Sequence, residues 1–198
     1  MQKKTMENNW YSSLLEFSKN LKCNSMMFNG KKLEKKKQII FYESKRSKKQ
    51  DQTKRVFGYK WNKIDSYKEG LTKRHHKWLK EKYKKEFYVD KLRKNSIILD
   101  AGCGSAISSE LLFGKYLKNL RFIGVDISNA IEVAWSRFNK NNINSIFIQC
   151  DLNKIPLFDE SIDLIFSEGV LHHTDNPFKA LMNITKKLKK KGLILFYI

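Results

Sequence analysis

The sequence predicts an α/β protein with a doubly wound, mostly parallel β-sheet and a basic, mainly helical N-terminal extension. Two observations carry this prediction. From residue 96 onward, short apolar runs alternate with amphipathic stretches at helical spacing. Residues 1–95 hold 28 Lys and Arg against 10 Asp and Glu, whereas residues 96–198 hold 12 against 10. We therefore divide the chain into an extension, residues 1–94, and an α/β core, residues 95–198.

In the extension, apolar residues recur at helical spacing over residues 10–21 and again over residues 71–87, which predicts a helix in each stretch. The lysine-rich part between them, residues 31–55, is either a short strand at Ile39–Tyr42 between charged loops or a partly ordered linker. Such clustered charge could bind RNA, because phosphates attract cations. However, 34 of the 40 basic residues are Lys. This bias favours compositional drift over a dedicated RNA-binding arm, since nucleic-acid contacts usually use Arg.

In the core, the sequence predicts five strands and three helices. The predicted strands lie at residues 97–99, 122–125, 146–148, 162–166 and 193–198, and the predicted helices at residues 111–120, 131–138 and from 176 onward. The last helix begins at Asn176, which can cap free N–H groups, and Pro177 fits its first turn. Lys186–Lys191 are expected in its C-terminal turn, where the helix dipole favours cations, and Gly192 is expected to end it.

The first strand ends in an acid and enters a glycine-rich turn, Asp100–Gly104. Gly102 and Gly104 have no Cβ, so the backbone can turn sharply there and approach a ligand closely. Ligands of doubly wound sheets bind at the carboxyl ends of the strands. A dinucleotide fingerprint would need a further glycine where Ile107 stands, so the pattern argues against NAD.

Two more acids follow strands of the core. Asp126 ends the second strand, where a carboxylate can accept hydrogen bonds from ribose hydroxyls. Asp151 follows the third strand, within reach of an adenine amino group, with Leu152 beside it. The alternative is that each acid only caps a turn or a helix. Three strand-end acids in order favour a nucleoside-binding site.

These residues resemble the motifs of the class I S-adenosylmethionine-dependent methyltransferases, particularly the type related to ubiquinone and menaquinone biosynthesis. The matching segments are Asp100–Gly104, Gly124–Ser128, Asp151–Leu157, Ser161–Ser167 and Val170–His173. The resemblance covers residues 95–198 and implies a Rossmann-like fold and S-adenosylmethionine as cofactor. One departure is Ala106, which stands where many members have glycine.

The resemblance also implies roles for single residues. Gly102 and Gly104 would approach the amino-acid part of the cofactor, Asp100 would orient that end, and Asp126 would hold the ribose. Asp151 and Leu152 would flank the adenine. We also assign Ile127 and Ser167, which belong to the same motifs, to the cofactor site.

His172 and His173 follow the fourth strand and are the candidate catalytic residues, because an imidazole titrates near neutral pH. The alternative is that they pack and fix the loop, as such a pair does in family members with unlike substrates. The sulfonium is already activated, so holding the acceptor in line supplies much of the rate. Cys103 has no neighbour in the sequence that would activate it as a nucleophile.

The sequence therefore predicts methyl transfer to a small-molecule acceptor, a sugar or a lipid intermediate. Phe57–Trp61 resembles an aromatic entry segment of members that act on sugars. The alternatives are an RNA methyltransferase that uses the basic extension, and an inactive cofactor-binding remnant. Ser167–Val170 stands where base-methylating RNA enzymes often carry an Asn/Asp-Pro-Pro-Tyr motif, which counts against that chemistry.

Three further expectations follow. The family's sheet normally continues past the fifth strand with an antiparallel pair, so we expect the chain to be cut short at its C-terminus and to be poorly soluble. No apolar run approaches the ~20 residues of a membrane span, and the N-terminus lacks a signal peptide. The three cysteines lack metal-ligand spacing, which predicts reduced thiols in a cytoplasmic protein without a metal site. The sequence does not indicate an oligomeric state.

Overall fold

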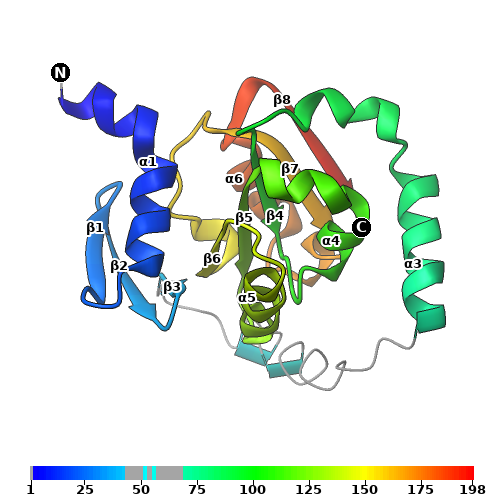
Figure 1. The fold of residues 1–198 in the computed structure, drawn as a ribbon, viewed down its shortest axis with the longest axis horizontal. Coiled ribbons are helices and arrows are strands. Elements are labelled where there is room, and N and C mark those ends of the chain that lie inside the picture. The colour runs from blue at the N-terminus through cyan, green and yellow to red at the C-terminus, as the bar shows by residue number, and fades with distance from the viewer. Residues whose placement is uncertain (1, 43–50, 53–54, 57–68) are drawn as a thin grey trace.

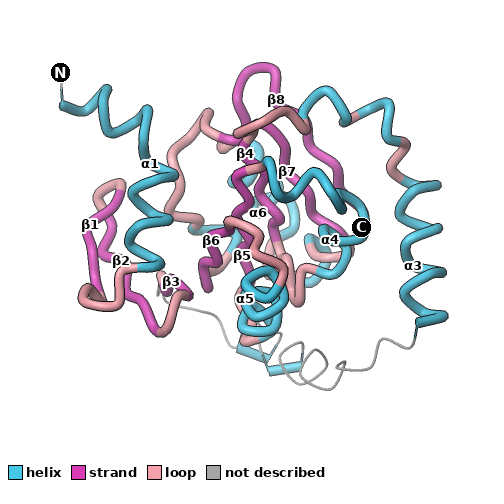
Figure 2. Tube along the Cα trace, in the orientation of Figure 1, coloured by secondary structure: helices cyan, strands magenta, loops and turns pink. Residues whose placement is uncertain are grey.

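The computed structural model describes residues 2–42, 51–52, 55–56 and 69–198. Its strands form one sheet in the order β1-β2-β3-β6-β5-β4-β7-β8 (Figures 1 and 2). The strands are β1 (Ser25–Phe28), β2 (Lys31–Lys36), β3 (Ile39–Phe41), β4 (Ile97–Ala101), β5 (Arg121–Asp126), β6 (Ser145–Gln149), β7 (Ile162–Glu168) and β8 (Leu188–Tyr197). The five predicted core strands are thus confirmed as β4 to β8.

The core strands β4 to β8 pair in parallel. Their register aligns Asp100 of β4 with Gly124 of β5, and Asp126 of β5 with Gln149 of β6. This alignment brings the carboxyl ends of the central strands to one edge of the sheet. The doubly wound α/β class predicted from the sequence is confirmed.

Helices cover both faces of the sheet because the central strands are apolar on both sides. On one face lie α3 (Glu69–Lys82), α4 (Ile107–Phe113) and α5 (Ala130–Lys140), and on the other lie α1 (Gln2–Lys19) and α6 (Pro177–Thr185). Successive strand residues alternate between the two cores. Ile98 of β4 packs with the α3–α5 side, and Leu99 packs with the α1–α6 side.

The N-terminal extension is part of the same sheet. β1 and β2 form an antiparallel hairpin, β3 pairs antiparallel with β2, and β3 then pairs in parallel with β6, with Ile40 opposite Ile148. The predicted short strand at Ile39–Tyr42 corresponds to β3. The buried ammonium group of Lys35 donates to Phe17 O at 2.8 Å and to Asn20 O, which fastens the C-terminal end of α1 to β2.

The prediction for Lys186–Lys191 is wrong. Helix α6 begins as predicted, with Asn176 Oδ1 accepting a hydrogen bond from Lys179 N at 2.8 Å, but it ends at Thr185. Lys186 and Lys187 form a turn after the helix, Lys189–Lys191 lie in β8, and Gly192 lies inside that strand. Tertiary ion pairs explain the difference, because Lys187 Nζ lies 2.6 Å from Asp159 Oδ1 and Lys189 Nζ lies 2.8 Å from Asp163 Oδ1.

Two other helices are shorter than predicted. Helix α4 ends at Phe113, and residues Gly114–Asn119 form a 3₁₀ helix, with Gly114 at a positive φ of 44°. Helix α3 ends at Lys82 and is followed by short 3₁₀ helices at Lys85–Phe87 and Val89–Lys91. The apolar periodicity continues across these breaks, which is why the sequence suggested single helices.

Strand β8 is the last strand on its side of the sheet, at the opposite end from β1. Trp78 of α3 and the Lys82 ammonium group both contact the ring of Tyr197 at its end. The aromatic segment Phe57–Trp61 lies outside the described residues. In the part of the chain that the structure describes, no helix has the length and apolar character needed to cross a bilayer.

Candidate functional site

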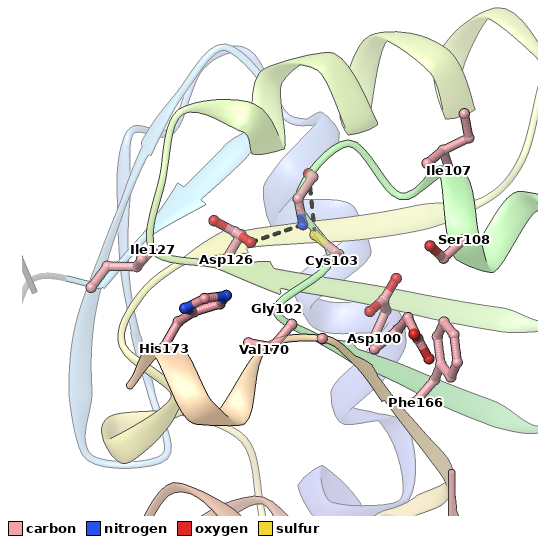
Figure 3. Close-up of a pocket in the computed structure, with 13 residues that line it drawn as sticks. Asp100, Gly102, Cys103, Ile107, Ser108, Asp126, Ile127, Phe166, Val170 and His173 are labelled. Atoms are coloured by element: carbon pink, nitrogen blue, oxygen red, sulfur yellow. Dashed lines mark hydrogen bonds between the residues drawn. The ribbon is translucent and has the colours of Figure 1, made fainter. Parts of the chain in front are cut away.

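A hollow with a cavity volume of about 110 Å³ opens at the carboxyl ends of β4, β5 and β7 (Figure 3). A second hollow, with a cavity volume of about 50 Å³, adjoins it. The residues shared by both hollows are Gly102, Asp126, Ile127, Val170 and His173.

The glycine turn after β4 borders both hollows. Gly102 has a φ of 89° and Gly104 a φ of 51°, and both values lie in the left-handed region that favours glycine. A Cβ atom at Gly102 would lie 2.2 Å from Val170 Cγ1. From the sequence, we explained the glycine at this position by the close approach of a ligand. The structure shows a second reason, because the Val170 side chain occupies the space that a Cβ would need.

Asp126 holds the glycine turn in place. Its Oδ2 accepts a hydrogen bond from Gly104 N at 2.8 Å, and its Oδ1 accepts from Ser128 N and Ser128 Oγ at 2.7 Å each. Burial raises the pKa of the Asp126 carboxyl, while the hydrogen bonds from Ser128 and Gly104 lower it. These bonds take up most of the roughly four acceptor positions of a carboxylate. Asp126 therefore lines the hollow and also fixes the backbone around it.

Asp100 lies at the end of β4 and faces the first hollow (Figure 3). It is 3% exposed, and its Oδ2 accepts a hydrogen bond from Ser109 Oγ at 2.6 Å. Burial raises the pKa of Asp100 to about 7; the bond from Ser109 lowers it, and the charges of Asp126 and Glu168 raise it further.

The first hollow is acidic although the chain as a whole carries a net charge of +20. Three carboxyl side chains line it, from Asp100, Asp126 and Glu168, and none of its described lining residues is Lys or Arg. Acidic walls of this kind suit a ligand with positive charge, since opposite charges nearby stabilise the ionised forms of both.

Asp151 and Leu152 line the second hollow only. Asp151 is buried and caps the 3₁₀ helix Leu152–Lys154, because its Oδ1 accepts a hydrogen bond from Asn153 N at 2.9 Å. Asp151 therefore both caps this 3₁₀ helix and lines the second hollow. The neighbouring Leu152 side chain supplies apolar surface.

The remaining site candidates lie in different places. His173 lines both hollows, whereas His172 lines neither, and their rings are 3.9 Å apart. Ser167 is fully buried and lines neither hollow, because its Oγ donates to Ala101 O at 2.8 Å and ties β7 to β4. Burial and the Asp100 charge raise the pKa of the Cys103 thiol, which keeps it protonated and unreactive.

Sequence reasoning missed two contributions from the extension. The Tyr83 hydroxyl donates a hydrogen bond to Glu168 Oε2, and His75 Nε2 lies 3.0 Å from Ser108 Oγ. Glu168 and Ser108 both line the first hollow. Glu168 could have been predicted from the sequence as a site residue, because it ends β7 in the same way as Asp126 ends β5. Tyr83 gave no local signal, since its partner is 85 positions away in the chain.

Several known proteins with similar sequences are methyltransferases. Residues 99–196 match the family model described as a methyltransferase domain. The chain is 34% identical over 111 residues to the ribosomal protein L11 methyltransferase of Thermosipho africanus, which covers 56% of this chain and 40% of that protein. It is 28% identical over 103 residues to a malonyl-[acyl-carrier protein] O-methyltransferase of Hamiltonella defensa, covering 52% of this chain and 38% of that protein.

A similar fold occurs in the crystal structure of a putative sarcosine dimethylglycine methyltransferase from Galdieria sulphuraria. The TM-score is 0.57 at 19% identity, over 74% of this chain and 59% of that chain. The chain spans between a quarter and about half of the length of the first curated relatives that it matches. Residues 99–196 form a domain of the class I S-adenosylmethionine-dependent methyltransferase family.

Proposed function

We propose that this protein binds S-adenosylmethionine in the two adjoining hollows and transfers its methyl group to a small-molecule acceptor. The observation that carries the proposal is the acidic hollow beside the glycine turn, in a domain of the methyltransferase family. S-adenosylmethionine has a sulfonium and an ammonium group, so acidic walls fit it in charge. The cofactor supplies an activated methyl group.

The two hollows suggest how the cofactor is held. Asp151 and Leu152 would flank the adenine in the second hollow, one with a carboxylate and the other with apolar surface. Asp126 and Ile127, which line both hollows, would take the ribose between them. Gly102, Gly104 and Asp100 would then meet the amino-acid end. Ser167 would contribute indirectly, by tying β7 to the strand that carries the turn.

His173 is the better placed of the two catalytic candidates, because it lines both hollows and His172 does not. As a base it would accept a proton from the acceptor as the methyl group is transferred. As a loop residue it would only keep Val170 against Gly102, and His173 N does donate to Val170 O at 2.9 Å. In either role, holding the acceptor in line is the main task of the protein.

A small-molecule acceptor, a sugar or a lipid intermediate, is favoured over RNA because 34 of the 40 basic residues are Lys and because two lysines of the extension serve the fold. Lys35 fastens α1 to β2, and the Lys31 ammonium group lies 5.3 Å from the centre of the Tyr42 ring. Cysteines at positions 23, 103 and 150 are free thiols, which suits a cytoplasmic protein.

Calorimetric titration with S-adenosylmethionine and S-adenosylhomocysteine tests the proposal. We expect saturable binding of both ligands and none of NAD, because Ile107 replaces the glycine that a dinucleotide site requires. Folded protein that binds neither adenosyl ligand would contradict the proposal. Incubation of a small-molecule extract and of total RNA with methyl-labelled cofactor then identifies the acceptor class, and label only in RNA would overturn the small-molecule assignment.

A further inference from the structure

Glu168 occupies a position in the first hollow that the roles above leave without a function. It ends β7 and lines the hollow together with Asp100 and Gly102, but it does not line the second hollow where Asp151 lies. Its Oε2 accepts a hydrogen bond from the Tyr83 hydroxyl. Among the described residues, no donor reaches its other oxygen, Oε1.

Tyr83 is well suited to hold this carboxylate. Its side chain is buried, and its ring packs edge-on against Phe166 with centroids 5.5 Å apart, which fixes the hydroxyl in direction. Burial and the neighbouring Glu168 raise the pKa of the Tyr83 hydroxyl far above its ordinary value, so it remains a donor at every physiological pH. The Glu168 carboxylate is thereby oriented from a segment of the extension.

Asp100 offers a second open acceptor in the same hollow. The side chain is more than nine-tenths buried, its Oδ2 is taken by Ser109 Oγ, and no described residue donates to its Oδ1. Figure 3 shows the Asp100 carboxylate directed into the hollow. Asp100 Oδ1 and Glu168 Oε1 therefore both remain open to a ligand that brings a cationic donor, and a hydrogen bond between such a donor and a carboxylate is charge-assisted.

We propose that Glu168, positioned by Tyr83, binds the α-ammonium group of the cofactor beside Asp100. The inference rests on the proposed function, because it concerns the amino-acid end of the same ligand. Glu168 belongs to this end because it shares a hollow with Asp100 and the glycine turn and not with Asp151. The basic extension, through Tyr83, therefore takes part in cofactor binding.

The test compares two ligands that differ only at the amino-acid end. S-adenosylhomocysteine carries the ammonium group, whereas 5′-methylthioadenosine has the same adenosine and thioether without it. For Glu168→Gln we expect roughly tenfold to hundredfold weaker binding of S-adenosylhomocysteine, as for loss of a charge-assisted hydrogen bond. Binding of 5′-methylthioadenosine should change less than about twofold, because that ligand makes no such bond.

Tyr83→Phe is expected to weaken the binding of S-adenosylhomocysteine as well, but by a smaller factor than Glu168→Gln. Added to Glu168→Gln, it should weaken binding little further, because Tyr83 acts through Glu168. Glu160→Gln is the matched control, since Glu160 is an exposed carboxylate outside both hollows. Thermal unfolding of each variant checks that it folds.

The outcomes separate the inference from the proposed function. If Glu168→Gln weakens the binding of both ligands equally, Glu168 is a structural residue and the inference is wrong. Unchanged affinity for S-adenosylhomocysteine would also overturn it while leaving the proposed function intact. Wild-type protein that binds neither ligand would refute the proposed function itself, and the inference with it.

Discussion

Replacing Asp100 by Asn is expected to stabilise the ligand-free protein at neutral and alkaline pH. The substitution removes a buried negative charge and keeps the shape of the side chain. It also keeps an acceptor for the Ser109 hydroxyl, which lies 2.6 Å from Asp100 Oδ2. What changes is therefore the charge and little else.

The magnitude follows from the raised pKa of Asp100, about 7 in the fold against 3.8 ordinarily. Below about pH 4 the carboxyl is protonated in both folded and unfolded chains, so it has no effect on stability. Between about pH 4 and 7 the unfolded chain ionises first, and stability falls as pH rises. A difference of about three in pKa corresponds to at most about 4 kcal/mol, reached above about pH 7.

Urea unfolding followed by circular dichroism at about pH 4.5, 6 and 8 measures this difference in the free energy of unfolding. Asp100→Asn should exceed the wild type by only about 1 kcal/mol at the lowest pH, and by increasingly more at higher pH. Asp90→Asn, at an exposed carboxyl outside the hollow, is the control. A stability difference that does not depend on pH, or a less stable Asp100→Asn at pH 8, would refute the reasoning.

Three further outcomes are expected. Gly102→Val should abolish S-adenosylhomocysteine binding and keep most of the helical signal, because φ is 89° and a Cβ would lie 2.2 Å from Val170 Cγ1; surviving affinity would remove the turn from the site. Asp126→Ala should weaken the binding of S-adenosylhomocysteine by about 1.5–3 kcal/mol, because ribose contacts are lost and the Gly104 turn is loosened. An unchanged affinity in calorimetric titration would exclude Asp126 from the cofactor site. Fluorescence titration with RNA should show weak binding that falls steeply with salt, as counterion release produces, whereas tight and sequence-selective binding at physiological salt would favour an RNA acceptor.

Local sequence determined the core and much of its ligand-facing edge. Apolar runs and helical periodicity placed the five core strands, because burial on both faces of a parallel sheet leaves a signal within each strand. Asn176 was identified as a cap because its partner, Lys179 N, is three positions away. Asp100, Asp126 and Asp151 stand directly after apolar strands, and parallel pairing brings such positions to one edge of the sheet.

Tertiary structure alone decided how distant segments meet. Strand β3 joins the core by pairing Ile40 with Ile148, and Tyr83 reaches Glu168 across 85 positions. Lys187, expected to end a helix, instead pairs with Asp159. Helix caps and apolar periodicity depend on residues within about one helical turn of each other, so they can be recognised directly in the sequence. A contact between distant residues forms only when whole elements pack, and its energy is shared among side chains that no single segment contains.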